Sequence, residues 1–313
     1  MVWKRNACNA GTPDDAGAVL VTGASSGIGR TCVLRLARAG FRVFAGVLRV
    51  EDGLTLQKDA GGVVDSVRLD VTEPDDIHTA TALLSDKLGS AGLFGLVNNA
   101  GIAVAGPMET VRLDDLRRQL EVNVLGHVAV TQSVLELLYR AKGRVINMSS
   151  ISGRIALPFF GSYAASKHAL EALSDSWRVE LAPAGVRVVV VEPGCVDTPA
   201  WAKSLTAAAH DRRDWSESAR LRYDAPATAM RALTMRTLAH GISAERVSQV
   251  VLRAITAARP KARYVVGPDA VLGLWMKRVL SDRLRDALVR AAMALVRNPA
   301  GAEEFESEKG DTN

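Results

Sequence analysis

Short apolar runs rich in valine, leucine and isoleucine alternate with longer segments of helical periodicity along most of the chain. The runs are continuously apolar, which is typical of strands covered by helices on both faces. We therefore expect strands at 18–22, 42–47, 64–69, 94–97, 144–148, 186–191 and in a final ARYVVG run. The intervening segments predict helices, among them 29–39, 74–88, 113–140, 162–181 and 244–258. This alternation predicts a doubly wound, mostly parallel α/β sheet, the Rossmann fold, in a single domain.

The rhythm of strands and helices stops between residues 199 and about 240, where small apolar residues mix with charged ones. This segment follows the carboxyl end of a predicted strand, which is where open α/β sheets bind ligands. We expect it to be a helical substrate lid, more mobile than the sheet. The predicted domains are a flexible tail at 1–17, a catalytic domain at 18–268 that contains the lid, a C-terminal helical extension at 269–300 and a flexible tail at 301–313.

Composition narrows the classes of function. The chain has 48% hydrophobic and 23% charged residues, as in ordinary globular proteins, and a formal net charge of +5. Its basic residues are scattered among acidic ones instead of forming a run, so we expect no nucleic-acid partner. No apolar stretch approaches the roughly 18 residues that a membrane span needs. The first residues also lack the apolar core of a secretory signal.

The cysteines and histidines form no recognisable ligand pattern. Cys8, Cys32 and Cys195 lie far apart and include no CxxC pair. The five histidines share no metal-ligand spacing, so neither a metal site nor a disulfide framework is predicted. With no secretory signal, this cysteine usage favours a cytoplasmic protein.

The first predicted strand runs into the turn TGASSGIG at 22–29 and then into a helix. Glycine permits a tight turn and lets backbone N–H groups approach a pyrophosphate at a helix N-terminus. The spacing is GxxxGxG and not GxGxxG, so a turn that only allows close packing stays an alternative on this motif alone. The candidate cofactor contacts in the turn are Gly23, Ser25, Ser26, Gly27, Ile28 and Gly29.

Tyr163 and Lys167 are four positions apart on a predicted helix, so they share a face. A free tyrosine has a pKa near 10, and an adjacent cation favours the phenolate and lowers that pKa. Tyr163 could then exchange a proton with an oxygen atom during catalysis. Taken alone, Lys167 would be interpreted first as a surface lysine of the helix.

Further signatures follow the glycine turn in order: NNAG at 98–101, Asn123 within EVNVLG, Ser149 and Ser150, YAASK at 163–167, and PG at 193–194. Together they resemble the short-chain dehydrogenase/reductase family over about residues 18–198. The segments FRVFAGVL, LFGLVNNAGI and RAKGRVINMSSISGR are similar to its retinol dehydrogenase and hydroxybutyrate dehydrogenase branch.

The resemblance implies that Asn123, Ser150, Tyr163 and Lys167 are the catalytic residues. Ser150 is preferred to Ser149 because the family's serine precedes the tyrosine by thirteen positions, and 163 minus 13 is 150. In the family, the residue corresponding to Asn123 holds a water that connects the lysine to solvent.

The resemblance also implies a nicotinamide cofactor, NAD or NADP. Asp70 would contact the adenine, although it could instead cap the next helix. An acid after the second strand would favour NAD, but Arg49 occurs there and favours NADP, whereas the branch resemblance favours NAD. The preference stays open. The expected contacts outside the glycine turn are Arg49, Asp70, Val71, Asn99, Ala100, Gly101, Tyr163, Lys167, Pro193, Gly194, Val196 and Thr198.

These residues predict an oxidoreductase that moves a hydride between NAD(P)(H) and a carbonyl or secondary alcohol of a fairly apolar, retinoid-, steroid- or lipid-like substrate. One alternative is a dehydrogenase of small 3-hydroxyacids, with Arg212 or Arg213 holding the carboxylate. A non-catalytic dinucleotide sensor is a second, but such a protein is expected to lack at least one of the four catalytic residues. The family resemblance further implies a homodimer or homotetramer, formed through the helices that bear Asn123 and Tyr163.

Overall fold

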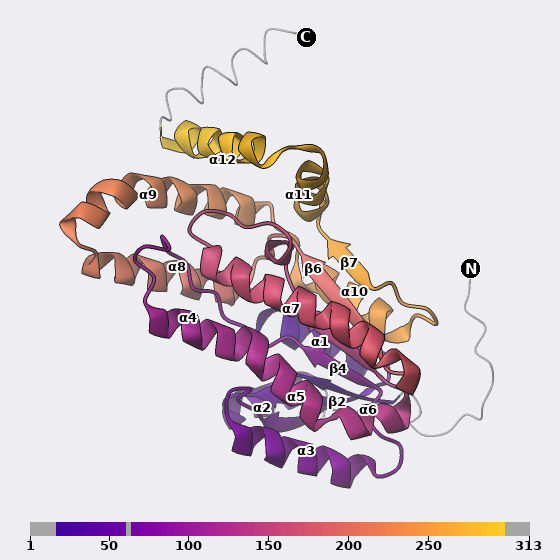
Figure 1. The fold of residues 1–313 in the computed structure, drawn as a ribbon. Helices are drawn as coiled ribbons and strands as arrows, with labels where there is room; N and C mark the ends of the chain where they lie inside the picture. Colours follow the sequence, from indigo (N-terminus) through magenta and orange to yellow (C-terminus); the bar gives the residue numbers. More distant parts are fainter. Residues whose placement is uncertain (1–16, 61–63, 298–313) are drawn as a thin grey trace.

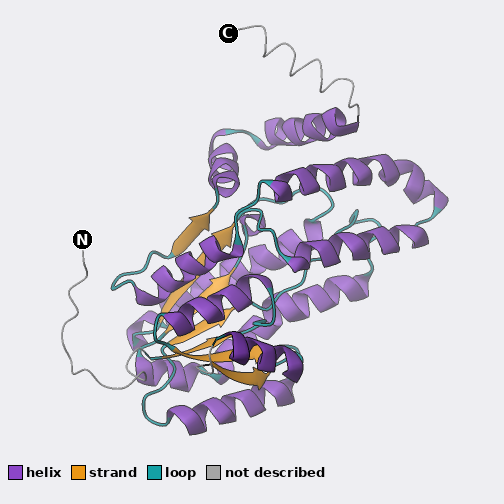
Figure 2. Cartoon of the chain, turned by 180° about the vertical axis from the view of Figure 1, so that it is seen from behind, coloured by secondary structure: helices purple, strands orange, loops and turns teal. Residues whose placement is uncertain are grey.

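The computed structural model describes residues 17–60 and 64–297. Seven parallel strands form one sheet in the order β3-β2-β1-β4-β5-β6-β7. The strands are β1 (Ala18–Val21), β2 (Arg42–Val47), β3 (Val64–Arg68), β4 (Gly95–Asn98), β5 (Arg144–Met148), β6 (Arg187–Pro193) and β7 (Arg263–Val266). Helices flank the sheet on both faces (Figures 1 and 2). The predicted fold class is therefore confirmed.

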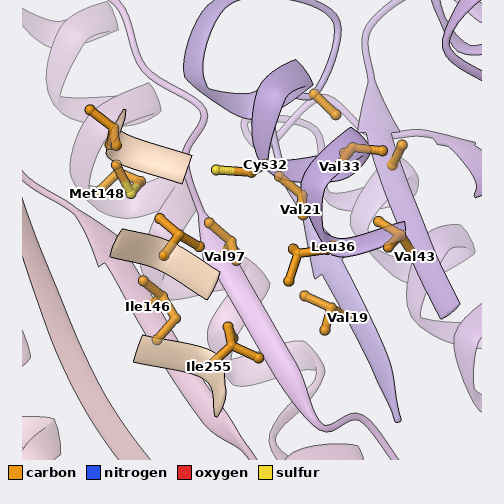
Figure 3. Packing of buried hydrophobic residues seen from close by; sticks show 14 of the residues in the cluster. Val19, Val21, Cys32, Val33, Leu36, Val43, Val97, Ile146, Met148 and Ile255 are labelled. Carbon is orange, nitrogen blue, oxygen red and sulfur yellow. The ribbon is translucent and has the colours of Figure 1, made fainter. Parts of the chain in front are cut away.

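Alternate strand residues face two separate apolar clusters, as the pleat of a strand requires. On one face, Val19, Val21 and Ile146 pack against α1 (Gly27–Arg38), α2 (Val50–Asp59) and α10 (Ala244–Thr256), as Figure 3 shows. On the other face, Leu20 and Leu96 pack against α3 (Pro74–Leu88), α5 (Gly126–Ser133) and α6 (Leu135–Ala141). Burial on both faces explains why the strands read as unbroken apolar runs.

The long helix predicted at 113–140 is not continuous. It divides into α4 (Leu113–Leu120), a π-helical turn at Glu121–Leu125, α5 and α6. Apolar residues keep a helical spacing across these breaks, so periodicity could not reveal them. The helix α2 was not among the predicted elements.

The predicted lid segment is more regular than its sequence suggested. It forms α8 (Pro199–Asp211), a 3₁₀ turn at Arg212–Asp214 and α9 (Glu217–Ala239). The C-terminal extension begins with α11 (Pro268–Val279) and α12 (Asp282–Arg297). The tails predicted at 1–17 and 301–313 lie outside the described residues, apart from Gly17.

The remaining helical elements are a 3₁₀ turn at Ile151–Gly153, α7 (Gly161–Glu180) and a 3₁₀ turn at Ala182–Ala184. Across the described ranges, no helix is both long and apolar enough to cross a membrane. The same ranges contain no group of three histidine, cysteine, aspartate or glutamate side chains placed to hold a metal ion.

Candidate active site

The predicted cofactor and catalytic residues gather at the carboxyl ends of the central strands. The strand order reverses between β1 and β4, and open α/β sheets bind ligands at such a switch point. The glycine turn follows β1, the NNAG turn continues from the end of β4 and Ser150 follows β5. Helices α8 and α9 lie side by side beyond the end of β6 (Figure 1).

The glycine turn is a backbone cradle. Gly23 and Gly27 have φ angles of +62° and +53°, a region that side-chain-bearing residues rarely adopt. A Cβ on Gly29 would lie 2.2 Å from the carbonyl oxygen of Gly23. Ser26 precedes α1 without capping it, so the first amides of the helix are free to bind a ligand. Free amides at a helix N-terminus fit the pyrophosphate of a dinucleotide.

Asn99 of the NNAG turn, directly after β4, supports this cradle. Its side-chain amide donates to the carbonyl oxygens of Thr22 and Gly23, at 3.0 and 3.1 Å. The hydroxyl of Thr22 accepts from the backbone amides of Asn99 and Ala100, both at 3.0 Å. Two signatures that are about 75 residues apart therefore form one rigid unit.

Three of the four predicted catalytic residues, Tyr163, Lys167 and Ser150, lie close together. Tyr163 and Lys167 lie on α7, with the ammonium 5.8 Å from the centroid of the phenol ring. Ser150 lies at the end of β5, where its hydroxyl accepts from the backbone amide of Ser152 at 3.1 Å. The hydroxyl of Ser150 is close enough to the phenol of Tyr163 to lower the pKa of that phenol. Ser149, by contrast, has a buried hydroxyl with no partner among the described residues.

Asn123 occupies the π-helical turn and is fully buried. Its amide donates to the carbonyl oxygen of Ile102 at 2.9 Å and to the Ser166 hydroxyl at 3.0 Å. Its oxygen accepts from the amide of Ile102 at 2.8 Å. A Cβ on Gly101 would lie 3.3 Å from the Asn123 oxygen and 3.8 Å from the Lys167 nitrogen. The side chains of Asn123 and Lys167 therefore both approach this glycine.

Burial controls the protonation of the catalytic pair. It raises the pKa of Tyr163 to about 12, and the hydrogen bond with Ser150 opposes the rise. It lowers the pKa of Lys167 to about 8, and the negative charge of Glu171 opposes that fall. The sequence-based argument expected the cation to lower the pKa of Tyr163, and in the chain alone this is wrong because desolvation of the phenol is the larger effect. Tyr163 is therefore held as a protonated donor at neutral pH.

The nicotinamide side of the site is supported by a residue that the sequence did not reveal. Asp269, in the first turn of α11, accepts from the backbone amide of Cys195 at 2.6 Å. A Cβ on Gly194 would lie 2.2 Å from the same carboxylate. The signal in the sequence was only an acid after Gly267 and Pro268, which indicates a helix start and not a partner 74 residues away.

The other residues predicted on this side lie at the end of β6 and in the segment between β6 and α8. Pro193 ends β6, and Val196 is buried and pairs with Ile242 in an isolated bridge. Thr198 precedes α8, and its side chain would lie 3.4 Å from a Cβ on Gly27. The glycine turn and the segment after β6 thus lie against each other.

On the adenine side, the structure gives Asp70 a local role. Its carboxylate accepts from the backbone amide and the hydroxyl of Thr72, at 3.0 and 2.7 Å. The N-cap of α3 is Glu73, so Asp70 is not the cap of that helix. Val71 is buried in the core, so only its backbone could meet a cofactor.

Arg49 lies just beyond the end of β2, at the N-cap position of α2. Its side chain is 75% exposed and forms an ion pair with Asp52 at 3.3 Å. An exposed guanidinium at this place is accessible to a cofactor phosphate, but the neighbouring carboxylate competes for it.

The predicted lid carries an aromatic residue directly against Tyr163. The Trp201 ring lies 5.9 Å from the ring of Tyr163 and 5.6 Å from that of Phe160, both in edge-on geometry. Sequence reasoning placed Trp201 in the lid but gave it no partner, because the contact joins α8 to α7 across the crevice. The tyrosine hydroxyl therefore lies beside an apolar wall.

A separate cavity next to the predicted lid is rich in acids. It has a volume of about 290 Å³ and lies between the loop at 104–112 and helices α8 and α9, and its charged lining residues are Glu109, Arg112, Asp115, Asp211 and Asp214. Glu109 also joins that loop to α9, through an ion pair with Arg222 and a hydrogen bond of 2.8 Å from the hydroxyl of Tyr223.

Two of the histidines, His127 and His168, form hydrogen bonds with backbone carbonyl groups. The imidazole of His127 is fully buried, and its Nε2 lies 2.7 Å from the carbonyl oxygen of Ala100. Burial, reinforced by the charge of Lys167, lowers the pKa of His127 to about 3, so the ring stays neutral. His168 bonds to the carbonyl oxygen of Ala164 in its own helix.

Comparisons with known proteins agree with this geometry. A family model described as short chain dehydrogenase matches residues 17–209. Retinol dehydrogenase 5 of Mus musculus is 37% identical over 280 residues, covering 87% of each chain. The NADPH-dependent 3-dehydrocapnine reductase of Ornithobacterium rhinotracheale is 34% identical, covering 86% of this chain and 94% of the relative. A solved short-chain dehydrogenase from Streptomyces avermitilis has a TM-score of 0.70 at 26% identity, covering 96% of this chain and 100% of that one.

Proposed function

The chain belongs to the short-chain dehydrogenase family, on its retinol dehydrogenase side, and is an NAD(P)-dependent oxidoreductase; from this we propose that it interconverts a carbonyl and a secondary alcohol on a fairly apolar substrate. The observation that carries the proposal is that Lys167 and Ser150 both lie close to Tyr163, whose ring is in edge-on contact with the ring of Trp201. The cradle at the glycine turn and the crevice towards Thr198 supply a place for the cofactor.

The proposed chemistry uses the chain's own groups for the proton and the reacting oxygen. Bound NAD(P)H supplies the hydride. Tyr163 donates its proton to the carbonyl oxygen, and the raised pKa of its phenol keeps that proton in place at neutral pH. Ser150 donates a hydrogen bond to the same oxygen and stabilises its developing charge. The ammonium of Lys167 stabilises the phenolate that remains, and Asn123 contributes to the path by which the proton is replaced.

The substrate class follows from the surroundings of Tyr163. Trp201 and Phe160 form an apolar wall next to the reacting position. The cavity beside α8 and α9 has four acids and one arginine in its lining, a balance that disfavours a carboxylate there, and Arg212 is already paired with Asp224 at 2.6 Å. These features favour an apolar alcohol or ketone over a small 3-hydroxyacid. The relatives named as a retinol dehydrogenase and a 3-dehydrocapnine reductase support the same class of reaction.

Substrate profiling tests this proposal. Oxidation of NADH and NADPH would be followed with two matched ketone series, one apolar and one of 3-oxoacids with the same chain lengths. We expect kcat/KM to rise with chain length in the apolar series and to stay low for the 3-oxoacids. Preference for the short 3-oxoacids would favour the hydroxyacid alternative, and binding of the dinucleotide without turnover of any ketone would favour a sensor.

The assembly and the compartment also stay proposals. We propose a homodimer or homotetramer that uses the helices bearing Asn123 and Tyr163, and a cytoplasmic location that rests on the scattered cysteines. Light scattering of the purified chain and fractionation of its native cells test the two points separately.

A further inference from the structure

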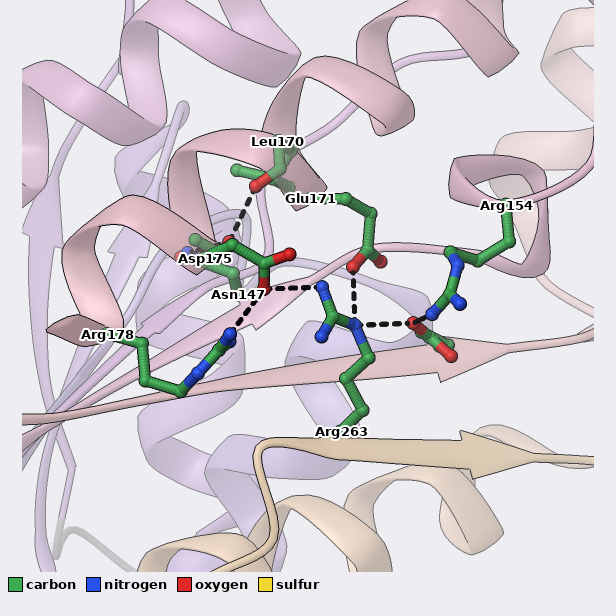
Figure 4. Close-up of polar contacts among 9 residues, drawn as sticks. Asn147, Arg154, Leu170, Glu171, Asp175, Arg178 and Arg263 are labelled. Carbon is green, nitrogen blue, oxygen red and sulfur yellow. Dashed lines mark hydrogen bonds and ion pairs between the residues drawn. The ribbon is translucent and has the colours of Figure 1, made fainter.

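A cluster of charged side chains lies one helical turn beyond the catalytic lysine (Figure 4). Glu171 follows Lys167 by four positions on α7, so the two share a face, and they are 5% and 4% exposed. The guanidinium of Arg263, on β7, lies 3.0 Å from the Glu171 carboxylate. It also lies 3.2 Å from the carboxylate of Glu192, which is fully buried in β6.

Three further cations and one acid complete this cluster. Arg154 lies 3.1 Å from Glu192. Asp175, one turn further along α7, pairs with Arg263 at 2.5 Å and with Arg178 at 2.7 Å. Lys277 of α11 donates to the carbonyl oxygen of Arg154.

The cluster is not a simple stabilising ion pair. One oxygen of Glu171 and one of Glu192 are buried with no hydrogen-bond partner in the described part of the chain. Buried charge without full pairing costs free energy, so two incompletely satisfied carboxylates are expensive for folding alone. Of these carboxylates, it is the charge of Glu171 that acts on the buried ammonium of Lys167, in an interior where the low dielectric strengthens it.

The environment of Lys167 contains no other anion that could act on it. Its ammonium donates to the carbonyl oxygen of Met148 at 2.8 Å. The titratable groups that face it are Tyr163 and Glu171 on α7 and His127 on α5, of which His127 is neutral because its pKa is about 3. Tyr163 is protonated at neutral pH. Glu171 is thus the one anion acting on the ammonium among the described residues.

The same glutamate touches the loop that carries the catalytic serine. A Cβ on Gly153 would lie 3.0 Å from Cγ of Glu171 and 3.1 Å from the carbonyl oxygen of Lys167. The turn at Ile151–Gly153, which begins directly after Ser150, therefore lies against this part of α7.

We infer that Glu171 is a positioning residue of the active site: held by Arg263, its carboxylate keeps the ammonium of Lys167 charged and seats the Ser150 loop against α7. This inference rests on the proposed function, because it assigns Glu171 a task only if Lys167 acts in catalysis. It predicts that Glu171 sets the upper pH limit of carbonyl reduction. Above that limit, Lys167 loses its proton and no longer stabilises the phenolate.

The test compares Glu171→Gln with Asp175→Asn. Both changes remove a carboxylate that pairs with Arg263, but only Glu171 lies one turn from Lys167. In Glu171→Gln the alkaline fall of kcat/KM should move to lower pH by about one unit, so the loss relative to wild type grows with pH. In Asp175→Asn the alkaline fall of kcat/KM should stay at the wild-type pH. In Glu171→Asp, which keeps the negative charge, this fall should lie close to the wild-type pH.

A readout without turnover separates this inference from the proposed function. Lysine labelled with ¹³C at Cε allows the Lys167 resonance to be titrated by NMR, with Lys167→Arg for assignment. Its midpoint should fall in Glu171→Gln and stay in Asp175→Asn, whether or not any ketone is reduced. Unchanged midpoints, or a loss of activity that is equal at every pH, would overturn the inference. Should Glu171→Gln fail to fold, the double variant Glu171→Gln with Arg263→Gln is compared with Arg263→Gln alone; an equal Lys167 midpoint in these two proteins would also overturn the inference.

Discussion

Tyr163 is the residue on which the proposed reaction depends, through its phenol group. It lies among the Lys167 ammonium, the Ser150 hydroxyl and the Trp201 ring, so its proton is available only to a group that enters the crevice. The raised pKa makes it a weak acid that gives up its proton as negative charge develops on the substrate oxygen. The ring and the hydroxyl therefore have separable roles.

Tyr163→Phe tests that separation. Removing the hydroxyl should lower kcat/KM by about 10² to 10⁴, the usual contribution of a general acid, while the ring keeps its packing and cofactor affinity changes little. Stopped-flow reduction of an apolar ketone and titration of NAD(P)H fluorescence measure the two effects. Tyr139→Phe, a partly buried tyrosine on α6, is the matched control. Near wild-type turnover in Tyr163→Phe would refute the mechanism.

Arg49 bears on the choice of cofactor. Its guanidinium is exposed at the end of β2 and weakly paired with Asp52. If it binds a 2′-phosphate, Arg49→Ala should weaken NADPH about tenfold or more, while NADH affinity stays within about twofold. Calorimetric titration with both cofactors measures this, with the exposed Arg117→Ala on α4 as a control. Equal effects on the two cofactors would make Arg49 an ordinary surface cation.

Helices α8 and α9 bury few large apolar residues. Their buried residues are small apart from Leu205 and Met230. The lid is held at its outer end by Glu109, which bonds to Arg222 and Tyr223, and by the Phe159 ring, which lies edge-on to Tyr223 at 6.4 Å. Phe159 has a φ of +67°, a strained conformation that such contacts can hold. Polar contacts at an exposed edge open more readily than a core.

Hydrogen exchange tests whether this segment is a lid. In the free protein, amides of residues 199–240 should exchange much faster than those of residues 186–191, and they should slow when cofactor and a substrate analogue are added. Glu109→Gln should speed exchange in α9 without affecting β6. If the segment were as protected as the sheet before any ligand is added, it would be a fixed wall.

How well each element could be predicted depends on where its stabilising contacts come from. The bounds predicted for β2, β5 and α3 match because a buried strand and a helix with proline at its start are marked in the local sequence. The π turn around Asn123 was missed, and the lid was predicted as helical but without the bounds of its helices, because tertiary packing, not apolar periodicity, sets these features. The same holds in the site. Glycine spacing and the Tyr163–Lys167 pair are local, but Asp269 reaches Cys195 only through the fold.

At the scale of the whole molecule, the C-terminal extension is joined to the site at two points. Asp269 at the start of α11 holds the backbone after β6, and Lys277 near its end holds the loop after Ser150 through Arg154. Helix α12 packs instead against the lid helix α9. The boundary proposed at residue 268 therefore separates the sheet from a helix that supports the cofactor side of the crevice.

Two truncations distinguish the roles of these helices. A chain that ends at Leu280 keeps α11 and should bind NAD(P)H as the full chain does, with faster exchange only in α9. A chain that ends at Gly267 loses Asp269 and should bind more weakly, because a hydrogen bond to a charged group contributes about 1.5 to 3 kcal/mol, roughly a ten- to a hundredfold change in affinity. Asp269→Asn in the full chain controls for unfolding, since it weakens the same bond and leaves α11 in place. Calorimetric titration gives the affinities, and circular dichroism confirms that each chain is folded. Equal affinity in all four proteins would show that α11 has no part in the cofactor site. An equal loss in both truncated chains, with none in Asp269→Asn, would assign the effect to the bulk of the extension and not to the carboxylate at its start.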